Sequence, residues 1–91
     1  MNDEASLCQL SSGMHATVSD VVADAELQGR LLGLGLLVGT RFQILRRGTH
    51  ASNIPFILAI GETRVALDYK IAEMILVKNE SLLTMVAKSV N

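Results

Sequence analysis

The sequence predicts a small, mainly β domain: a barrel of about five short strands, with one helix between the first two strands and a helix at the C-terminus. Its 91 residues suffice for a single domain. Short apolar runs alternate with glycine-containing turns, and short antiparallel strands close most easily into a barrel that removes exposed edges. Only 3% of the residues are aromatic, so we expect a core of Leu, Ile and Val.

The N-terminal part is expected to contain the first strand. Residues 1–6 are polar, and we expect them to be frayed. Leu7 and Leu10 form a short apolar anchor that ends in a turn at Gly13. The β-rich segment 14–22 then alternates apolar and polar residues, which predicts a strand.

A helix should follow this strand. Asp24 is the expected N-cap, because its carboxylate can accept from the unpaired amides of the first turn. Leucines recur at i, i+4 and i+7, which predicts one apolar stripe facing the core, made of Leu27, Leu31 and Leu34. Gly29 and Gly33 lower helix propensity, and their small size suggests that another backbone passes close to them.

The segment 30–39, RLLGLGLLVG, contains the expected helix end. Gly35 is placed to adopt positive φ after the last turn, with Leu36 folding back as its hydrophobic partner. Val38 and Gly39 fit the central pair of a type II turn, since glycine occupies the position that needs positive φ.

The rest of the chain should complete the barrel. Further strands are expected over residues 40–47, 56–60, 64–67 and 74–78. Gly61 and Glu62 suit a type II′ hairpin turn, and Asp68 is expected to cap a short helical turn over 69–73. We therefore expect a barrel over residues 7–78 and a helical extension over 79–91, which begins at Asn79 and either docks on the barrel or meets a partner.

Overall composition excludes several classes of partner. The net charge of −1 favours neither nucleic acid nor an anionic membrane surface. The single cysteine, Cys8, rules out an internal disulfide and fits a reducing compartment. The start of the chain lacks the features of a signal peptide, and no apolar run reaches the ~20 residues that span a bilayer. We expect a cytoplasmic protein that does not insert into the membrane.

Enzyme chemistry has little support in the sequence. The acidic residues lie scattered at expected turns and caps, and no nucleophile stands in a recognisable context with a base. Gly33, Gly35 and Gly39 lack the Lys-Ser or Lys-Thr that follows the last glycine of a phosphate-binding loop. We therefore expect neither catalysis nor a cofactor.

Two sets of side chains could still bind something. Cys8, His15 and His50 could hold zinc or iron, but no pair has the spacing of metal ligands, so the fold or a dimer interface would have to assemble the site. Basic residues cluster on the expected strand after Gly39 and could, with Arg30, meet an acidic surface; they are Arg41, Arg46 and Arg47. The alternative for this basic cluster is a solvated strand end.

The order of several motifs resembles one family. The chain reads Leu7-x-x-Leu10-x-x-Gly13, then Arg30-Leu31-x-x-Leu34-Gly35-Leu36-x-x-Gly39, then Gly61-x-x-x-Val65-Ala66-Leu67 and Ala72-x-x-Ile75-x-Val77. This pattern over residues 7–78 resembles the FeoA family, the small accessory proteins of bacterial ferrous iron uptake. The sequence departs from the family at Val38, where proline is usual, in the loop GTHASN, and after Lys78.

The resemblance implies an SH3-like barrel, similar to the C-terminal domain of metal-dependent repressors. It also implies a non-enzymatic module that docks on the membrane ferrous iron permease with a cytoplasmic GTPase domain. We expect this contact to use the exposed members of a leucine group, with two arginines at its rim: Leu34, Leu36 and Leu37, and Arg46 and Arg47.

Two other interpretations stay open at this point. One is a small transition-metal-binding or metal-sensing protein that uses Cys8, His15 or His50. The other is a regulatory domain of a metal-dependent repressor, which we favour less because no helix-turn-helix precedes the barrel in this sequence. The sequence is also compatible with a homo-oligomer.

Overall fold

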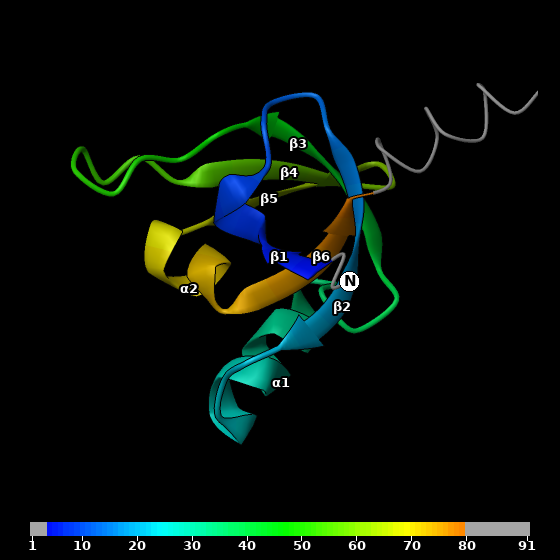
Figure 1. The fold of residues 1–91 in the computed structure, drawn as a ribbon. Coiled ribbons are helices and arrows are strands. Elements are labelled where there is room, and N and C mark those ends of the chain that lie inside the picture. Colours follow the sequence, from blue (N-terminus) through cyan, green and yellow to red (C-terminus); the bar gives the residue numbers. More distant parts are fainter. Residues whose placement is uncertain (1–3, 80–91) are drawn as a thin grey trace, which may run out of the picture.

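The computed structural model describes residues 4–79, which form one curled, antiparallel sheet with two α-helices (Figure 1). The strands follow the order β1-β6-β2-β3-β4-β5 across the sheet. Their bounds are β1 Glu4–Ser6, β2 His15–Val21, β3 Arg41–Arg46, β4 Phe56–Ile60, β5 Thr63–Leu67 and β6 Ile75–Asn79. The helical elements are the 3-10 turn η1 Leu7–Gln9, α1 Ala25–Gly33 and α2 Tyr69–Glu73. The mainly β fold class is confirmed.

The first strand of the sheet was not predicted. Residues Glu4–Ser6, expected to be frayed, pair with β6, with Glu4 opposite Lys78 and Ser6 opposite Leu76. Strand pairing uses backbone groups, so the free side of β6 can hold a polar segment that shows no strand signal of its own. The sheet therefore has six strands, and α1 lies between the second and third. The expected start of the C-terminal helix, Asn79, ends β6, and residues 80–91 lie outside the described part of the chain.

The core lies inside the curled sheet and follows the period-two pattern of the strands. Alternate strand residues are buried, as are the apolar residues of η1 and one side chain each from α1 and α2. The largest fully buried side chains include Phe42, Phe56, Leu7, Leu31, Leu36 and Ile44. Both phenylalanines thus join the aliphatic core, which the low aromatic content had not led us to expect.

Helix α1 begins and ends as its residues predict. The Asp24 carboxylate accepts a hydrogen bond from the Leu27 amide at 2.8 Å. At the other end Gly35 has φ 89°, and its N–H donates to the Leu32 carbonyl at 2.9 Å. The Leu36 N–H donates to the Leu31 carbonyl at 2.9 Å, which completes a Schellman motif. Leu31 and Leu36 are both buried, so the predicted hydrophobic partner is confirmed.

The turn after α1 is held to strand β2. The Thr40 N–H donates to the Leu37 carbonyl at 2.9 Å and Gly39 has φ 96°, as the predicted type II turn requires. The Gly39 N–H donates to the Val18 carbonyl at 2.8 Å, and the Val18 N–H donates to the Thr40 carbonyl at 2.9 Å. These bonds fix the turn's position beside the sheet.

Two expectations about α1 are wrong. A Cβ atom at Gly29 or Gly33 would meet nothing within 4 Å, so no neighbouring backbone requires glycine there. Leu34 is exposed rather than part of the core stripe, because the helix ends at this residue and the Schellman turn directs Leu36 inward instead. Leu31 alone of the predicted stripe is fully buried, and Leu27 is partly buried.

The short helix α2 and the hairpin before it follow the predicted turns. Gly61 has φ 60° while Glu62 has negative φ, which fits a type II′ turn between β4 and β5. Asp68 occupies the N-cap position of α2, but its side chain makes no capping hydrogen bond, contrary to expectation. Neither α1 nor α2, in the part of the chain that the structure describes, is long and apolar enough to cross a membrane.

Gly48 is the glycine whose lack of a side chain the packing requires. A Cβ atom there would lie 2.6 Å from the Ile54 carbonyl oxygen and 2.7 Å from a ring carbon of Phe56. We predict that Gly48→Ala lowers the free energy of unfolding by about 1–3 kcal/mol, measured by urea denaturation, because β4 must shift to relieve the contact.

Gly29→Ala is the matched control for this substitution. It adds the same methyl group within a helix and into open space, so it should raise stability by about 1 kcal/mol through helix propensity. Equal effects of the two substitutions would contradict the packing assigned to Gly48.

Candidate interaction surface

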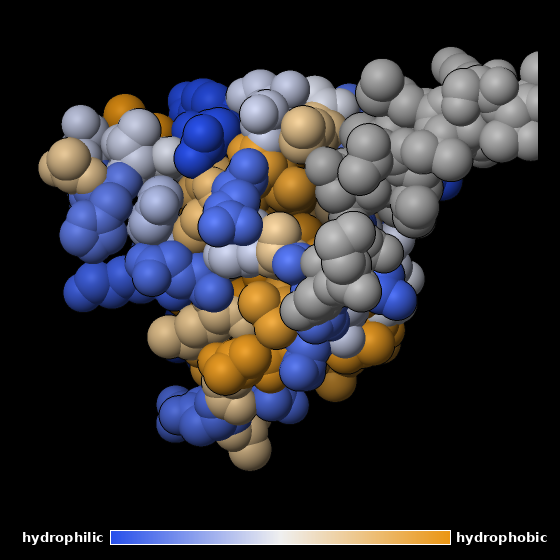
Figure 2. All heavy atoms as spheres, viewed as in Figure 1, coloured by the Kyte–Doolittle hydropathy of each residue, from blue (hydrophilic) through white to orange (hydrophobic). Residues whose placement is uncertain are grey.

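The end of α1 and the turn after it expose four large apolar side chains. The exposed fraction is 58% for Leu32, 45% for Leu34, 47% for Leu37 and 61% for Val38. The Schellman motif places Leu36 in the core, and the leucines before and after it in the sequence, Leu34 and Leu37, face outward. Figure 2 shows hydrophobic side chains exposed in the lower half of the molecule, above a mostly hydrophilic lower tip. We call these four residues the apolar surface.

A groove runs beside the apolar surface. Its volume is about 510 Å³. It is lined by side chains of α1, the following turn and the end of β2, including Gly29, Leu32, Leu36, Leu37, Val38, Asp20 and Val21. A side chain at Gly29 would stand at this groove, since no atom outside the helix lies within 4 Å of its Cβ position. Glycine at this position therefore keeps the groove wide.

The groove has little charge and a fixed shape. Asp20 is the only acidic or basic side chain among the described residues that line it, and its carboxylate accepts a hydrogen bond from the Val21 N–H at 2.8 Å. The bonds from the turn to β2 and from Thr40 Oγ1 to the Gly35 carbonyl, at 2.8 Å, hold the opposite wall. A preformed apolar hollow of this kind suits an apolar side chain or helix of another protein, because little ordering is needed on binding.

The structure separates the residues that we expected to act together. Leu34 and Leu37 are exposed, whereas Leu36 is 1% exposed and contributes only to the floor of the groove. Arg46 is exposed at the far end of β3, and Arg47 follows it. The two ends of this six-residue strand lie about 17 Å apart, so the arginines do not border the apolar surface.

Arg47 has a structural contact of its own. Its guanidinium Nη2 donates to the Cys8 carbonyl at 2.8 Å and so ties the end of β3 to η1. Arg41 lies at the start of β3 and Arg30 in the last turn of α1. The basic cluster expected on one strand is therefore divided between the two ends of β3.

The structure brings two of the three candidate metal ligands to one hollow and places the third elsewhere. His15 is at the start of β2, while Cys8 and His50 line one hollow together with Glu73. The Cys8 thiol is buried and donates to the Tyr69 carbonyl at 3.5 Å, and the His50 ring stands edge-on to the Tyr69 ring at 5.5 Å. Within residues 4–79 no three His, Cys, Asp or Glu side chains are grouped closely enough to hold a metal ion.

Sequence reasoning missed Leu32 and Val38 as surface residues. Leu32 follows the buried Leu31 directly, and on a helix adjacent residues point about 100° apart, so its exposure could have been found from the helical period. Val38 is the first central residue of the type II turn and is 61% exposed. Because the sequence predicts this turn, the exposure of Val38 could also have been expected.

A sequence model described as the FeoA domain matches residues 5–79. No curated protein sequence matches the chain. The match covers all six described strands apart from Glu4, the first residue of β1, and it includes the apolar surface.

Solved structures share this fold. The solution structure of a FeoA protein from Chlorobium tepidum is 27% identical, with a TM-score of 0.71 over 82% of this chain and 70% of that one. The crystal structure of an iron uptake regulatory protein, FeoA, is 22% identical, with a TM-score of 0.72 over 82% and 96%. A manganese-dependent transcriptional repressor in complex with manganese is 20% identical, with a TM-score of 0.76 over 87% of this chain and 38% of that one. The expected SH3-like fold is confirmed.

We predict that Cys8 reacts slowly with alkylating reagents. Burial raises the pKa of the Cys8 thiol above its ordinary value of 9.0, and the nearby Glu73 carboxylate raises the pKa further. The thiol therefore stays protonated at neutral pH, and the thiolate is the nucleophile. Iodoacetamide at pH 8 should modify the folded protein at least about tenfold more slowly than the urea-unfolded chain. Equal rates would show that this side chain is accessible and ionisable in the fold.

Proposed function

The chain belongs to the FeoA domain family, and on that premise we propose that it is a non-enzymatic accessory module of ferrous iron uptake. In this proposal it works in the cytoplasm and docks on the membrane permease that carries a cytoplasmic GTPase domain. The observation that carries the proposal is the apolar surface beside its groove. Exposed leucines around a fixed hollow are a feature of protein contacts.

The chemistry of the described residues supports binding rather than catalysis. No charged side chain is buried within residues 4–79, and the Cys8 thiol, whose pKa burial raises, is not part of the groove lining. Active sites commonly hold partly buried acids or bases with shifted pKa values. The groove is instead lined mostly by apolar side chains and backbone.

The geometry also suggests what the partner offers. The groove accepts an apolar group of moderate size, and the leucines on its border would cover that group and exclude water. A short apolar helix or loop of the GTPase domain would meet these requirements. Binding would then involve little change in this chain, since backbone hydrogen bonds already fix the turn.

We predict that Leu37→Ser weakens binding to the purified GTPase-bearing permease at least about fivefold, because it removes a central apolar contact. Leu45→Ser is the matched control, since Leu45 is 38% exposed on β3 and is not part of the groove lining. Biolayer interferometry with the detergent-solubilised permease measures both affinities. Equal affinity of the two variants, with folding intact by circular dichroism, would contradict the assigned surface.

We further predict opposite outcomes for two substitutions of Gly29. Gly29→Trp fills the groove and should abolish permease binding, whereas Gly29→Ala adds one methyl group and should leave it nearly unchanged. The same binding assay compares them. Full binding by the Gly29→Trp variant would show that the groove is not the docking site.

A further inference from the structure

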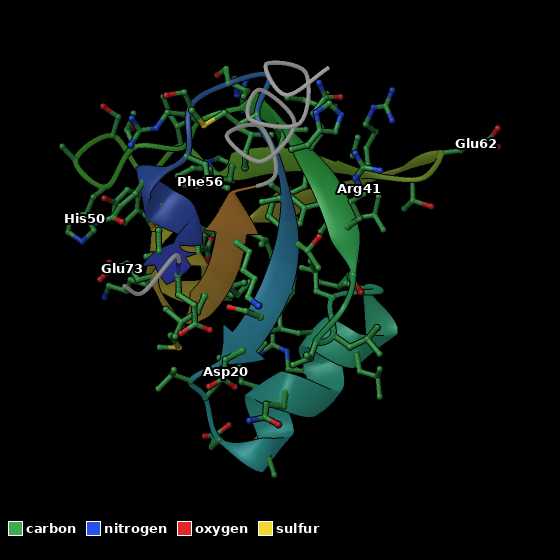
Figure 3. The ribbon with its side chains drawn as sticks, turned by 45° about the vertical axis from the view of Figure 1, so that its right-hand side comes forward. Asp20, Arg41, His50, Phe56, Glu62 and Glu73 are labelled. Atoms are coloured by element: carbon green, nitrogen blue, oxygen red, sulfur yellow. The ribbon has the colours of Figure 1, made fainter. Side chains whose placement is uncertain are left out.

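Strand β5 is an unprotected edge of the sheet. It lies at one end of the strand order, and β4 is the only described strand that pairs with it. The β4–β5 register runs through five consecutive pairs without a shift, whereas the β2–β6 and β3–β4 pairs are irregular. The hairpin projects from the body of the molecule, with Glu62 at its tip (Figure 3). Natural edges are commonly blunted by proline, a bulge or charged side chains; β5 has neither proline nor a bulge, and its one charged side chain is Arg64.

The hairpin turn determines which backbone groups face outward. In a two-residue hairpin the residues flanking the turn, here Ile60 and Thr63, exchange hydrogen bonds, and the pattern then alternates along the strand. The N–H and C=O groups of Arg64 and Ala66 therefore point away from β4. No described residue forms a hydrogen bond with them outside the strand pairing. Both residues are exposed.

Opposite charges stand two residues to either side of Ala66. Arg64 lies on β5, and Asp68 follows the end of the strand in extended conformation. The Asp68 side chain forms no capping bond with α2, and neither Asp68 nor Arg64 has an ion-pair partner in residues 4–79. Both are therefore available to another chain.

We propose that β5 pairs with β5 of a second copy of this chain, antiparallel and with the two-fold axis at Ala66. The Ala66 N–H of each copy donates to the Ala66 carbonyl of the other. Arg64 of one copy lies opposite Asp68 of the other, twice, and the Asp68 N–H reaches the Arg64 carbonyl. On the inner face Val65 stands opposite Leu67 of the second copy. The two sheets then form one continuous sheet, in which the outward N–H and C=O groups of each β5 are paired with those of the other copy.

Other registers of the same pairing lack this complementarity. A two-fold axis at Arg64 places two like charges directly opposite each other, which is unfavourable. An axis at Val65 places Arg64 opposite Ala66 and leaves both Asp68 carboxylates unpaired. The register about Ala66 brings opposite charges together at both ends, so charge complementarity selects a second copy of this chain as the occupant.

The proposed dimer is small and separate from the apolar surface. Pairing of one five-residue strand buries less than the ~1,200 Å² of a standard interface, so the dimer should be weak and concentration-dependent. Strands β2, β3 and β4 stand between β5 and β6 in the sheet, and the groove is lined by β2 and α1 rather than by β4 or β5. Dimerisation therefore leaves the docking surface open and does not depend on the proposed function.

Sedimentation velocity of the full chain from about 10 µM to 1 mM tests the proposal. We expect a monomer–dimer equilibrium that weakens about tenfold in Arg64→Asp and in Asp68→Arg, because each places like charges opposite each other twice. The variant with both substitutions restores opposite charges and should restore dimerisation. Arg30→Asp is the control for the change in net charge, since Arg30 is exposed in the last turn of α1, outside the β4–β5 hairpin, and it should leave the dimer unchanged.

Three outcomes would overturn the proposal. The first is a protein that stays monomeric at 1 mM, about the weakest affinity the experiment detects. The second is a dimer that is indifferent to the two charge reversals or is not restored by their combination. The third is a dimer that Leu37→Ser abolishes, which would place self-association on the apolar surface. If Leu37→Ser changes permease binding but still dimerises, the pairing of β5 remains supported, and the result concerns only the proposed function.

Discussion

The left-handed glycine at the end of α1 determines the arrangement of the rest of this surface. Gly35 at φ 89° turns the chain so that Leu36 enters the core beside Leu31. A residue with a Cβ atom is strained in this conformation, so glycine is needed for the turn rather than for space. Because Leu36 points inward, Leu34 and Leu37 on either side point outward. One backbone conformation thus supplies a core contact and exposes the apolar surface.

Hydrogen bonds to β2 convert this local turn into a fixed wall of the groove. The Gly39 amide and the Thr40 carbonyl bond to the backbone of Val18, and the Thr40 hydroxyl bonds to the Gly35 carbonyl. The exposed leucines therefore sit on a rigid support rather than on a free loop. A binding surface that is already ordered loses less entropy on association, which favours a small module that binds without changing shape. The proposed docking surface lies beside the central strand β2, and the proposed pairing edge is β5, so the two do not overlap.

The local features could be predicted from the sequence because each depends on the chemistry of a few adjacent residues. The Asp24 cap, the positive φ of Gly35, Gly39 and Gly61, and the alternation within strands belong to this class. Features that depend on distant partners could not be predicted. Residues Glu4–Ser6 become a strand only because β6 has a free side, and the exposure of Leu34 depends on where the helix ends and on the direction in which the chain leaves it.

The candidate surface shows the same division. The sequence predicts the turn that exposes Leu37, but it places Leu34 in the core stripe. The groove also needs the end of β2, which lies far away in sequence. We propose that this groove and its leucines form the docking surface on the permease. Hydrogen–deuterium exchange of the chain with and without the GTPase-bearing permease reports on this contact. Docking in the groove predicts slower exchange in peptides covering residues 28–40 and unchanged exchange in β5. Slower exchange confined to β5, or to the hollow lined by Cys8 and His50, would contradict it.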